Sequence, residues 1–416
     1  MIYNTSIDFA IELDENDPLV SFQEKFHFPV RENGEKHIYL CGNSLGLQAK
    51  KTEDFVKQEL DDWKELGVEG HFHARKPWLP YHEFLSESYS KIVGSKPSEV
   101  VAMNTLSVNL HLMMVSFYRP ENRRNKIIIE ADAFPSDIYA VESHLSHHGL
   151  DPAESLIKLK PRDGEVIIRS EDIIKVIEEN SETASLIMLG GVNYYTGQVF
   201  DMKLITHEAH KHNIVVGFDL AHAVGNIELF LNEWGVDFAV WCSYKYLNSG
   251  PGSVAGVFIH EKHHNNNLER FAGWWGHDKE SRFKMPDKFI PINTAEGWQL
   301  SNPPILSLAA VRASLSIFDE VGMQALIKKS KILTSYLDYL LSQIETDRIN
   351  IITPDDRGCQ ISISVKNGNK DLFNKITERG VIADWREPDV IRVAPVPLYN
   401  SYLDVYKFYK ILEDIL

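Results

Sequence analysis

The sequence predicts an α/β protein whose larger part is built on a mostly parallel sheet. Short, continuously apolar runs, typical of strands buried on both faces, alternate in the middle of the chain with helical segments. The clearest are the predicted strands 126–130, 185–189 and 214–218, with a predicted helix over 202–213. At 416 residues the chain is too long for one ordinary core, so we expect two domains.

The expected division places a large domain over residues 51–304 and a smaller C-terminal α+β domain over residues 305–416. Residues 1–50 are expected to form an N-terminal arm that contributes to the smaller domain. The large domain should begin with an amphipathic helix over residues 52–66, on which apolar side chains recur among acidic ones.

The remaining predicted elements lie in the arm and in the C-terminal domain. They are a helix near 18–25, a long helical segment over about 305–345, a half-buried strand at 360–365, a helix at 371–379, a strand at 390–395 and a final amphipathic helix.

Composition excludes several classes of protein. The chain is 44% hydrophobic and 25% charged, as soluble globular proteins are, and its net charge of −16 argues against a nucleic-acid partner. Its three cysteines, Cys41, Cys242 and Cys359, form no CxxC pair, which favours a reducing compartment and no structural zinc. The N-terminus lacks the order of a signal peptide and no apolar run is long enough for a membrane helix. We therefore expect a cytoplasmic protein.

A lone lysine, Lys245, lies between two predicted buried strands and is flanked by Tyr244 and Tyr246. The preceding apolar run covers 236–241, and the next covers 254–259 after a Gly-Pro-Gly turn. An amine held away from water loses its proton more readily, which suits it to Schiff-base chemistry. By itself, the pattern is more typical of a lysine on a surface loop.

Two further segments have the character of a ligand site. Asp219, with His222 after it, directly follows the strand 214–218, and ligands of open α/β sheets gather at the carboxyl ends of strands. A helix opens near Leu106 and Ser107, and its free N–H groups would suit a phosphate. Taken singly, Asp219 could cap the next helix and the helix start could be an ordinary N-cap.

Three other features each allow more than one interpretation from the sequence. His71 and His73 have no nearby carboxylate or cysteine, so a loop that meets a polar substrate is favoured over a metal site. Trp274 lies in a glycine-bounded loop and is interpreted as a rim or subunit-interface residue rather than core. Arg392, inside an apolar strand, needs an anion: a substrate carboxylate or, alternatively, an internal salt bridge or an outward-facing position.

The order of these features resembles that of the fold-type-I enzymes that depend on pyridoxal phosphate. Shorter blocks resemble the kynureninase family, and they are spread over nearly the whole chain: residues 42–48, 134–137, 195–198, 217–226, 241–248, 282–285 and 392–400. The resemblance implies a large domain with a mostly parallel sheet of the seven-stranded type. It also implies hydrolysis of L-kynurenine or 3-hydroxy-L-kynurenine to anthranilate or 3-hydroxyanthranilate and L-alanine, a step in tryptophan catabolism and NAD precursor synthesis.

The resemblance also implies roles for individual residues. Lys245 would carry pyridoxal 5'-phosphate as a Schiff base and act as general base, and Asp219 would pair with the pyridine nitrogen, where a carboxylate keeps the ring protonated. Tyr244 would meet the phosphate and could also donate a proton. The full implied cofactor site is Leu106, Ser107, Phe134, Pro135, Ser136, Asp137, Asp219, His222, Tyr244 and Lys245, with Trp274 and Asn302 from the second subunit of a homodimer. The implied substrate contacts are Ser44, His71, Asn302 and Arg392, and no metal is expected.

Two positions depart from the family pattern, and one rival remains. Ser107 stands where threonine is common and keeps the hydroxyl, whereas Gly190 stands where some relatives have serine and offers no side chain to the phosphate. A cysteine desulfurase of the same fold would need a reactive cysteine on a mobile loop. Cys242 and Cys359 lie at the edges of predicted strands, and Cys41 is also a poor candidate for that role. A relative without catalysis would be expected to lack Lys245, Asp219 or Arg392.

Overall fold

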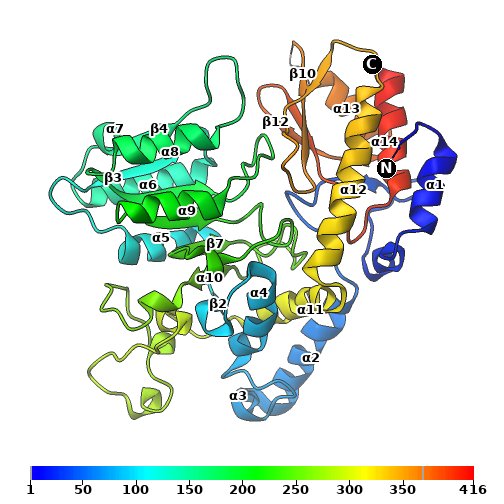
Figure 1. Ribbon diagram of the computed structural model, residues 1–416. Helices are drawn as coiled ribbons and strands as arrows, with labels where there is room; N and C mark the ends of the chain where they lie inside the picture. Colours follow the sequence, from blue (N-terminus) through cyan, green and yellow to red (C-terminus); the bar gives the residue numbers. More distant parts are fainter. Residues whose placement is uncertain (1, 368–369) are drawn as a thin grey trace.

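The protein is described by a computed structural model that covers residues 2–367 and 370–416 (Figure 1). Its largest sheet has seven strands in the order β2-β8-β7-β6-β5-β3-β4. Strand β8 runs antiparallel to both of its neighbours, and the other pairs are parallel. The strands are β2 (Val100–Ala102), β3 (Lys126–Glu130), β4 (Leu156–Leu159), β5 (Ala184–Gly190), β6 (Val215–Asp219), β7 (Phe238–Trp241) and β8 (Gly256–Ile259). The predicted α/β class with a mostly parallel sheet is confirmed.

Helices cover both faces of this sheet, because its strands are apolar on both sides. Ile128, Ile187 and Val216 face one core cluster with α8 and α9, whereas Ile129 and Met188 face a second cluster with α5 and α6. The helices of this part are α2 (Lys51–Leu66), α3 (Gly70–His73), α4 (Ser86–Val93), α5 (Leu106–Phe117), α6 (Pro135–His147), α7 (Pro152–Ser155), α8 (Ser170–Glu179), α9 (Met202–Lys211) and α10 (Leu231–Trp234).

A second, antiparallel sheet lies beside the C-terminal helices in Figure 1 and has the strand order β12-β13-β10-β9. A third core cluster joins it to α12, α13, α14 and, through Ala10, to α1 near the N-terminus. The strands are β9 (Ile349–Ile351), β10 (Ile361–Val365), β12 (Asp384–Arg386) and β13 (Val390–Val393). The helices are α1 (Ile7–Glu15), α12 (Met323–Ser342), α13 (Asp371–Glu378) and α14 (Tyr402–Ile415).

The N-terminal segment reaches the C-terminal part through a short parallel pair, β1 (Ile38–Tyr39) with β11 (Val381–Ile382). The chain also contains short 3-10 helices: η1 (Val20–Lys25), η2 (Gly67–Glu69), η3 (Tyr81–Leu85), η4 (Pro97–Glu99), η5 (Glu261–His263), η6 (Trp274–Gly276), η7 (Arg282–Lys284) and η8 (Ala295–Trp298). Among the residues described, no helix has the length and apolar character needed to cross a membrane.

The long helical segment expected over about 305–345 is two helices, α11 (Ile305–Val321) and α12. The break is at Gly322, whose φ of 75° is a conformation that glycine adopts readily. Helix α11 packs against α2, whereas α12 packs against α14. In the arm, the helix expected near 18–25 is the 3-10 helix η1, and α1 was not predicted. The domain boundaries at residues 50 and 304 stay a prediction.

Candidate active site

A pocket lies where β5 and β6 end and where α5 and α6 begin. Parallel strands bring their carboxyl ends to one edge of a sheet, so residues far apart in the sequence meet there. The pocket is lined by Leu106, Ser107, Glu130, Phe134, Ser136, Asp137, Gly190, Val192, Asn193, Tyr194, Asp219, Ala221, His222, Tyr244 and Lys245. The structure thus brings together nine of the predicted cofactor residues, and Pro135 is the first residue of α6 beside them.

The Lys245 amine is held at the pocket by His222 and Phe134. Its Nζ lies 3.0 Å from Nε2 of His222 and 5.9 Å from the centre of the Phe134 ring. Burial, reinforced by the positive charge of Lys245, lowers the pKa of His222 well below its ordinary value. A neutral imidazole can accept a hydrogen bond on Nε2, so His222 accepts from the Lys245 amine.

Two carboxyl groups, those of Asp219 and Asp137, are buried together in the pocket. Burial raises the pKa of Asp219, although the backbone N–H of Ala221, 2.7 Å from Oδ1, and the charge of Lys245 oppose the effect. Burial and the neighbouring charge of Asp219 raise the pKa of Asp137 well above its ordinary value. Two like charges buried side by side oppose each other's ionisation, and the larger upward shift is that of Asp137.

Two helices present their N-termini to the same corner of the pocket. Ser107 in the first turn of α5 and Ser136 in the first turn of α6 share a hydrogen bond of 2.8 Å between their hydroxyl groups. The N-cap residues, Thr105 and Phe134, make no side-chain capping bond. Backbone N–H groups and two positive dipole ends thus converge with two hydroxyls, an arrangement that suits a phosphate.

Three polar lining residues were missed by the sequence analysis, Glu130, Asn193 and Tyr194, as were the apolar Val192 and Ala221. Glu130 ends β3 and accepts hydrogen bonds from the backbone N–H of Gly190 at 2.6 Å and from the Asn193 amide at 2.7 Å. Burial raises the pKa of Glu130 to about 7, although both hydrogen bonds oppose the shift. A Cβ at Gly190 would lie 3.0 Å from Oε1 of Glu130, so Glu130 occupies the space that a side chain at position 190 would need.

Ser44 and Arg392 lie together beside the pocket wall rather than in its lining. Arg392 is 1% exposed and donates to the carbonyl oxygen of Tyr194 at 2.6 Å and to the carboxylate of Asp384. The internal salt bridge considered as an alternative for Arg392 is therefore present. Gly46 lies so close to the lysine loop that a Cβ there would be 2.3 Å from the Lys245 carbonyl oxygen.

The remaining predicted site residues lie elsewhere on this chain. Trp274 is 41% exposed, stacks edge-on against Phe283 and donates from Nε1 to the Arg282 carbonyl at 3.2 Å. Asn302 is exposed. His71 bonds to the carbonyl of its own turn and packs edge-on against Trp78, away from the pocket lining. Their roles stay predictions.

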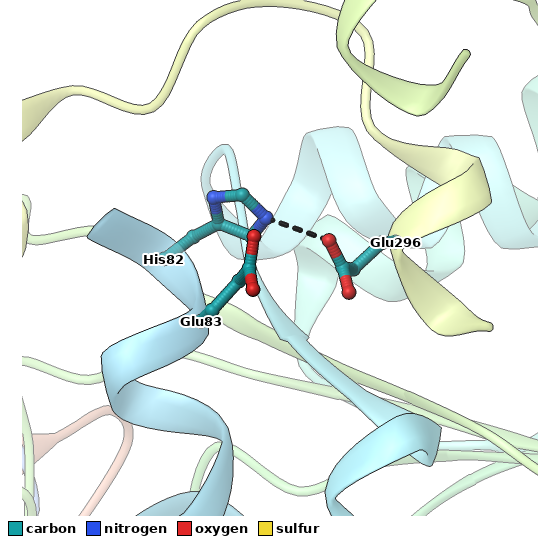
Figure 2. Close-up of side chains that lie close together, drawn as sticks. All are labelled: His82, Glu83 and Glu296. Carbon is teal, nitrogen blue, oxygen red and sulfur yellow. Dashed lines mark hydrogen bonds and ion pairs between the residues drawn. The ribbon is translucent and has the colours of Figure 1, made fainter. Parts of the chain in front are cut away.

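One cluster of side chains in the described part of the chain has the composition of a metal site: His82, Glu83 and Glu296 (Figure 2). Nε2 of His82 lies 2.9 Å from Oε2 of Glu296. The ammonium group of Lys279 pairs with Glu83 at 2.9 Å and with Glu296 at 2.8 Å. A cation of the chain itself thus already bridges the two carboxylates, and the cluster is explained as an ion-pair network that joins η3 to η8.

Comparison of the sequence with known proteins settles the family. A profile of the kynureninase C-terminal domain matches residues 326–412. The kynureninase of Koribacter versatilis is 55% identical over 98% of this chain and 97% of its own, and that of Myxococcus xanthus is 53% identical over 99% and 98%. The chain belongs to the kynureninase family.

Solved structures with a similar fold include enzymes of other specificities. A cysteine desulfurase from Thermococcus onnurineus matches with a TM-score of 0.76 at 15% identity over 97% of both chains. The cystine C–S lyase C-DES, in complex with cysteine persulfide, matches with a TM-score of 0.75 at 16% identity over 91% of this chain and 97% of its own. At such identities the likeness shows the fold alone, which is that of fold-type-I enzymes, whereas half of all positions are shared with the kynureninase family.

The pocket fits pyridoxal phosphate by the chemistry of its donor set. It offers an amine, a buried carboxyl pair, an exposed phenylalanine face and a phosphate corner. Oδ1 of Asp137 is buried and has no hydrogen-bond partner among the described residues, so the pocket contains a polar atom that a ligand could satisfy. A lysine-to-alanine variant of C-DES has been solved with glycine covalently linked to the PLP cofactor.

Proposed function

We propose that this enzyme hydrolyses the Cβ–Cγ bond of L-kynurenine, 3-hydroxy-L-kynurenine or both, to give anthranilate or 3-hydroxyanthranilate and L-alanine. Family membership at about 50% identity over nearly the whole length supports the reaction. The observation that carries the proposal is the shared pocket of Lys245, the Asp219–Asp137 pair and two helix N-termini.

Pyridoxal phosphate, when bound, would supply an electron sink that weakens bonds to the substrate α- and β-carbons. Lys245 would link to its aldehyde, Asp219 would face its pyridine nitrogen and Phe134 would lie against its ring. Ser107 and Ser136, with the first turns of α5 and α6, would hold its phosphate. Gly190 contributes no side chain there, so the phosphate would depend on these two helix starts and Tyr244.

The chain's own residues can move the protons that the reaction requires. His222 stays neutral and accepts a hydrogen bond from the Lys245 amine. Once the substrate amine has taken the place of Lys245 on the cofactor, the free Lys245 amine would be placed to remove the proton from the substrate Cα. Burial raises the pKa of the Tyr244 hydroxyl well above its ordinary value, so this phenol keeps its proton at neutral pH. Tyr244 can therefore donate a proton to the alanyl carbon or a hydrogen bond to the phosphate.

The substrate would lie between the lysine loop and the Ser44–Arg392 corner. Arg392 is proposed to bind the substrate carboxylate, and His71 the remainder of the substrate. Trp274 and Asn302, both on the surface of this chain, are proposed to complete the site of a second subunit in a homodimer. On the sequence evidence given above, we also propose a cytoplasmic location and a role in tryptophan catabolism and NAD precursor synthesis.

The proposal is tested with purified enzyme loaded with pyridoxal phosphate. A visible absorption band and release of fluorescent anthranilate from L-kynurenine, or of the hydroxylated product from 3-hydroxykynurenine, are the expected results. Lys245→Ala should abolish turnover and the borohydride-trapped adduct. Lack of product from both substrates, or an adduct on another lysine, would contradict it.

The same purified enzyme also distinguishes the proposed reaction from that of a cysteine desulfurase. Persulfide formation from cysteine would favour a desulfurase, but the structure gives that chemistry little support, because Cys242 and Cys359 are buried and Cys41 is half-buried. Burial also raises the pKa of Cys41 to about 11, which disfavours a thiolate nucleophile.

A further inference from the structure

One face of the second sheet carries a group of charges next to the pocket wall. Strands β12 and β13 place Asp384 directly opposite Arg392. Side chains alternate along a strand, so Arg386 extends from the same face as Asp384, whereas Trp385 packs on the other face against Phe373. Two guanidinium groups and one carboxylate therefore share this face.

A single oxygen atom connects the group. Oδ2 of Asp384 accepts hydrogen bonds from Arg392, from the Ser44 hydroxyl and, at 3.2 Å, from Nη2 of Arg386. With two arginines and one aspartate, these charges sum to one surplus positive charge. The substrate brings one carboxylate, which would neutralise the group.

Both arginines also have a donor without an acceptor in the described part of the chain. Nε of Arg392 and Nε of Arg386 are buried, and neither has a hydrogen-bond partner among the residues that the structure describes. Buried guanidinium donors without an acceptor are costly, and a carboxylate can accept from two guanidinium groups at once.

The Arg386 charge also reaches the pocket. Burial lowers the pKa of His222, and among the charges that lower it further are those of Lys245, Arg392 and Arg386. Tyr194, whose carbonyl binds Arg392, lines the pocket and is likewise influenced by the Arg386 charge. Arg386 is therefore part of the surroundings of the site and not a remote surface cation.

We propose that Arg386 is a second guanidinium of the substrate-carboxylate site, aligned with Arg392 by their shared bond to Asp384. The inference rests on the proposed function, which assigns the substrate carboxylate to Arg392, and it adds a residue to that corner. Arg386 would act in binding and in discrimination between substrates with and without a carboxylate, and not in proton transfer.

The test compares Arg386→Gln, Arg386→Lys and a matched control, Arg379→Gln. Arg379 is a surface arginine of the same part of the chain and forms an ion pair with Asp414 at 3.1 Å. Loss of a charge-assisted hydrogen bond should raise the KM for kynurenine by roughly tenfold or more in Arg386→Gln, with kcat within about twofold. Arg386→Lys should recover part of the loss, and Arg379→Gln should match the parent enzyme.

A binding measurement separates this inference from the proposed function. 3-Benzoylpropionate has the aryl ketone and carboxylate of the substrate without the amine, and 3-aminopropiophenone has the amine without the carboxylate. Calorimetry on the cofactor-loaded enzyme should show that Arg386→Gln weakens binding of the first by about tenfold and leaves the second unchanged.

The outcomes are distinct. Equal binding of 3-benzoylpropionate by Arg386→Gln and the parent would overturn the inference even if kynurenine is cleaved. Equal weakening of both ligands would also overturn it, because the effect would not depend on the carboxylate. Lack of kynurenine cleavage by the parent enzyme would instead contradict the proposed function.

Discussion

Glu130 faces the pocket with both of its carboxylate oxygens already bonded, one to the Gly190 N–H and one to the Asn193 amide. Hydrogen bonds to an ionised carboxylate favour ionisation, but the loss of solvent outweighs them here, and the pKa is raised to about 7. The result is a pocket in which Glu130, Asp137 and Asp219 compete for few positive charges, so a ligand with a cationic ring nitrogen would relieve their repulsion.

The shift at Glu130 predicts how stability depends on pH. The folded pKa lies above the ordinary 4.5, so between pH 4.5 and 7 the folded chain keeps a proton that the unfolded chain has released. Stability should therefore fall as pH rises through this window, by on the order of 3 kcal/mol in total from this group. Glu130→Gln should remove that part of the slope, measured by urea unfolding at several pH values with cofactor in fixed excess. Parallel curves for the two proteins would contradict the prediction.

At the scale of single residues, the sequence predicts those site residues that follow a strongly apolar strand or open a helix. Lys245, Asp219 and Ser107 have that position, and the structure brings all three to one pocket. Glu130 also follows a strong strand, but a glutamate at the end of an apolar run is indistinguishable in sequence from one that faces solvent. Asp384 and Arg386 were not predicted because the strand that pairs them with β13 is only three residues long. Register across strands, which determines these partners, is a tertiary property.

Among the elements, η3 and η8 are joined by the charged cluster of Figure 2. Burial tends to raise the pKa of Glu296, but its bonds to His82 and Lys279 outweigh burial and lower the pKa to about 2. A carboxylate stabilised in this way contributes stability above pH 4.5, and the contribution is lost as pH falls toward 2.

Glu296→Gln should therefore destabilise the protein at pH 7 by about 3 kcal/mol at most, and the difference from the parent should shrink as pH falls from 4.5 toward 2. Thermal unfolding over this range is the measurement, and Glu269→Gln is the control, because Glu269 pairs with Arg119 at an exposed position. A difference that does not change with pH would show that the Glu296 charge is not responsible.

The elements predicted best are those with a strong apolar period: β3, β5, β6 and α9 lie within one or two residues of the expected ranges. The sequence predicts one helical segment over about 305–345 because its apolar residues continue across Gly322. The helices separate there because α11 and α12 pack against different partners, and packing partners are not encoded in local periodicity.

On the scale of the whole molecule, the homodimer proposal has a sharp test. If Trp274 and Asn302 complete the partner's site, a subunit with Lys245→Ala and a subunit with Asn302→Ala should complement each other. Random pairing after mixed refolding or coexpression makes about half of the dimers mixed, and each mixed dimer has one intact site, so about a quarter of parental activity should return.

The control mixes equal amounts of the parent chain and a chain that carries both Lys245→Ala and Asn302→Ala. If Asn302 acts across the interface, the mixed dimers contain no intact site and about a quarter of parental activity should remain; if each site is built from one chain, about half should remain. If the mixture of the two single variants is no more active than the sum of the separate variants, each site is built from one chain. Native mass spectrometry of the same samples, in which the two substitutions change the subunit mass by different amounts, reports whether the mixed dimers form.

The hydrogen bond from Arg392 to the Tyr194 carbonyl ties the antiparallel sheet to the turn that follows β5, at the pocket wall. Arg392 belongs to β13 of the antiparallel sheet, whereas the Tyr194 ring stands edge-on to Phe134, the aromatic face of the pocket. If Arg392 binds the substrate carboxylate and Phe134 lies against the cofactor ring, as proposed, one linkage connects the residue that binds the carboxylate to the residue that flanks the ring. A substitution that changes which carboxylate-bearing substrates bind should then also change how tightly the cofactor ring is held.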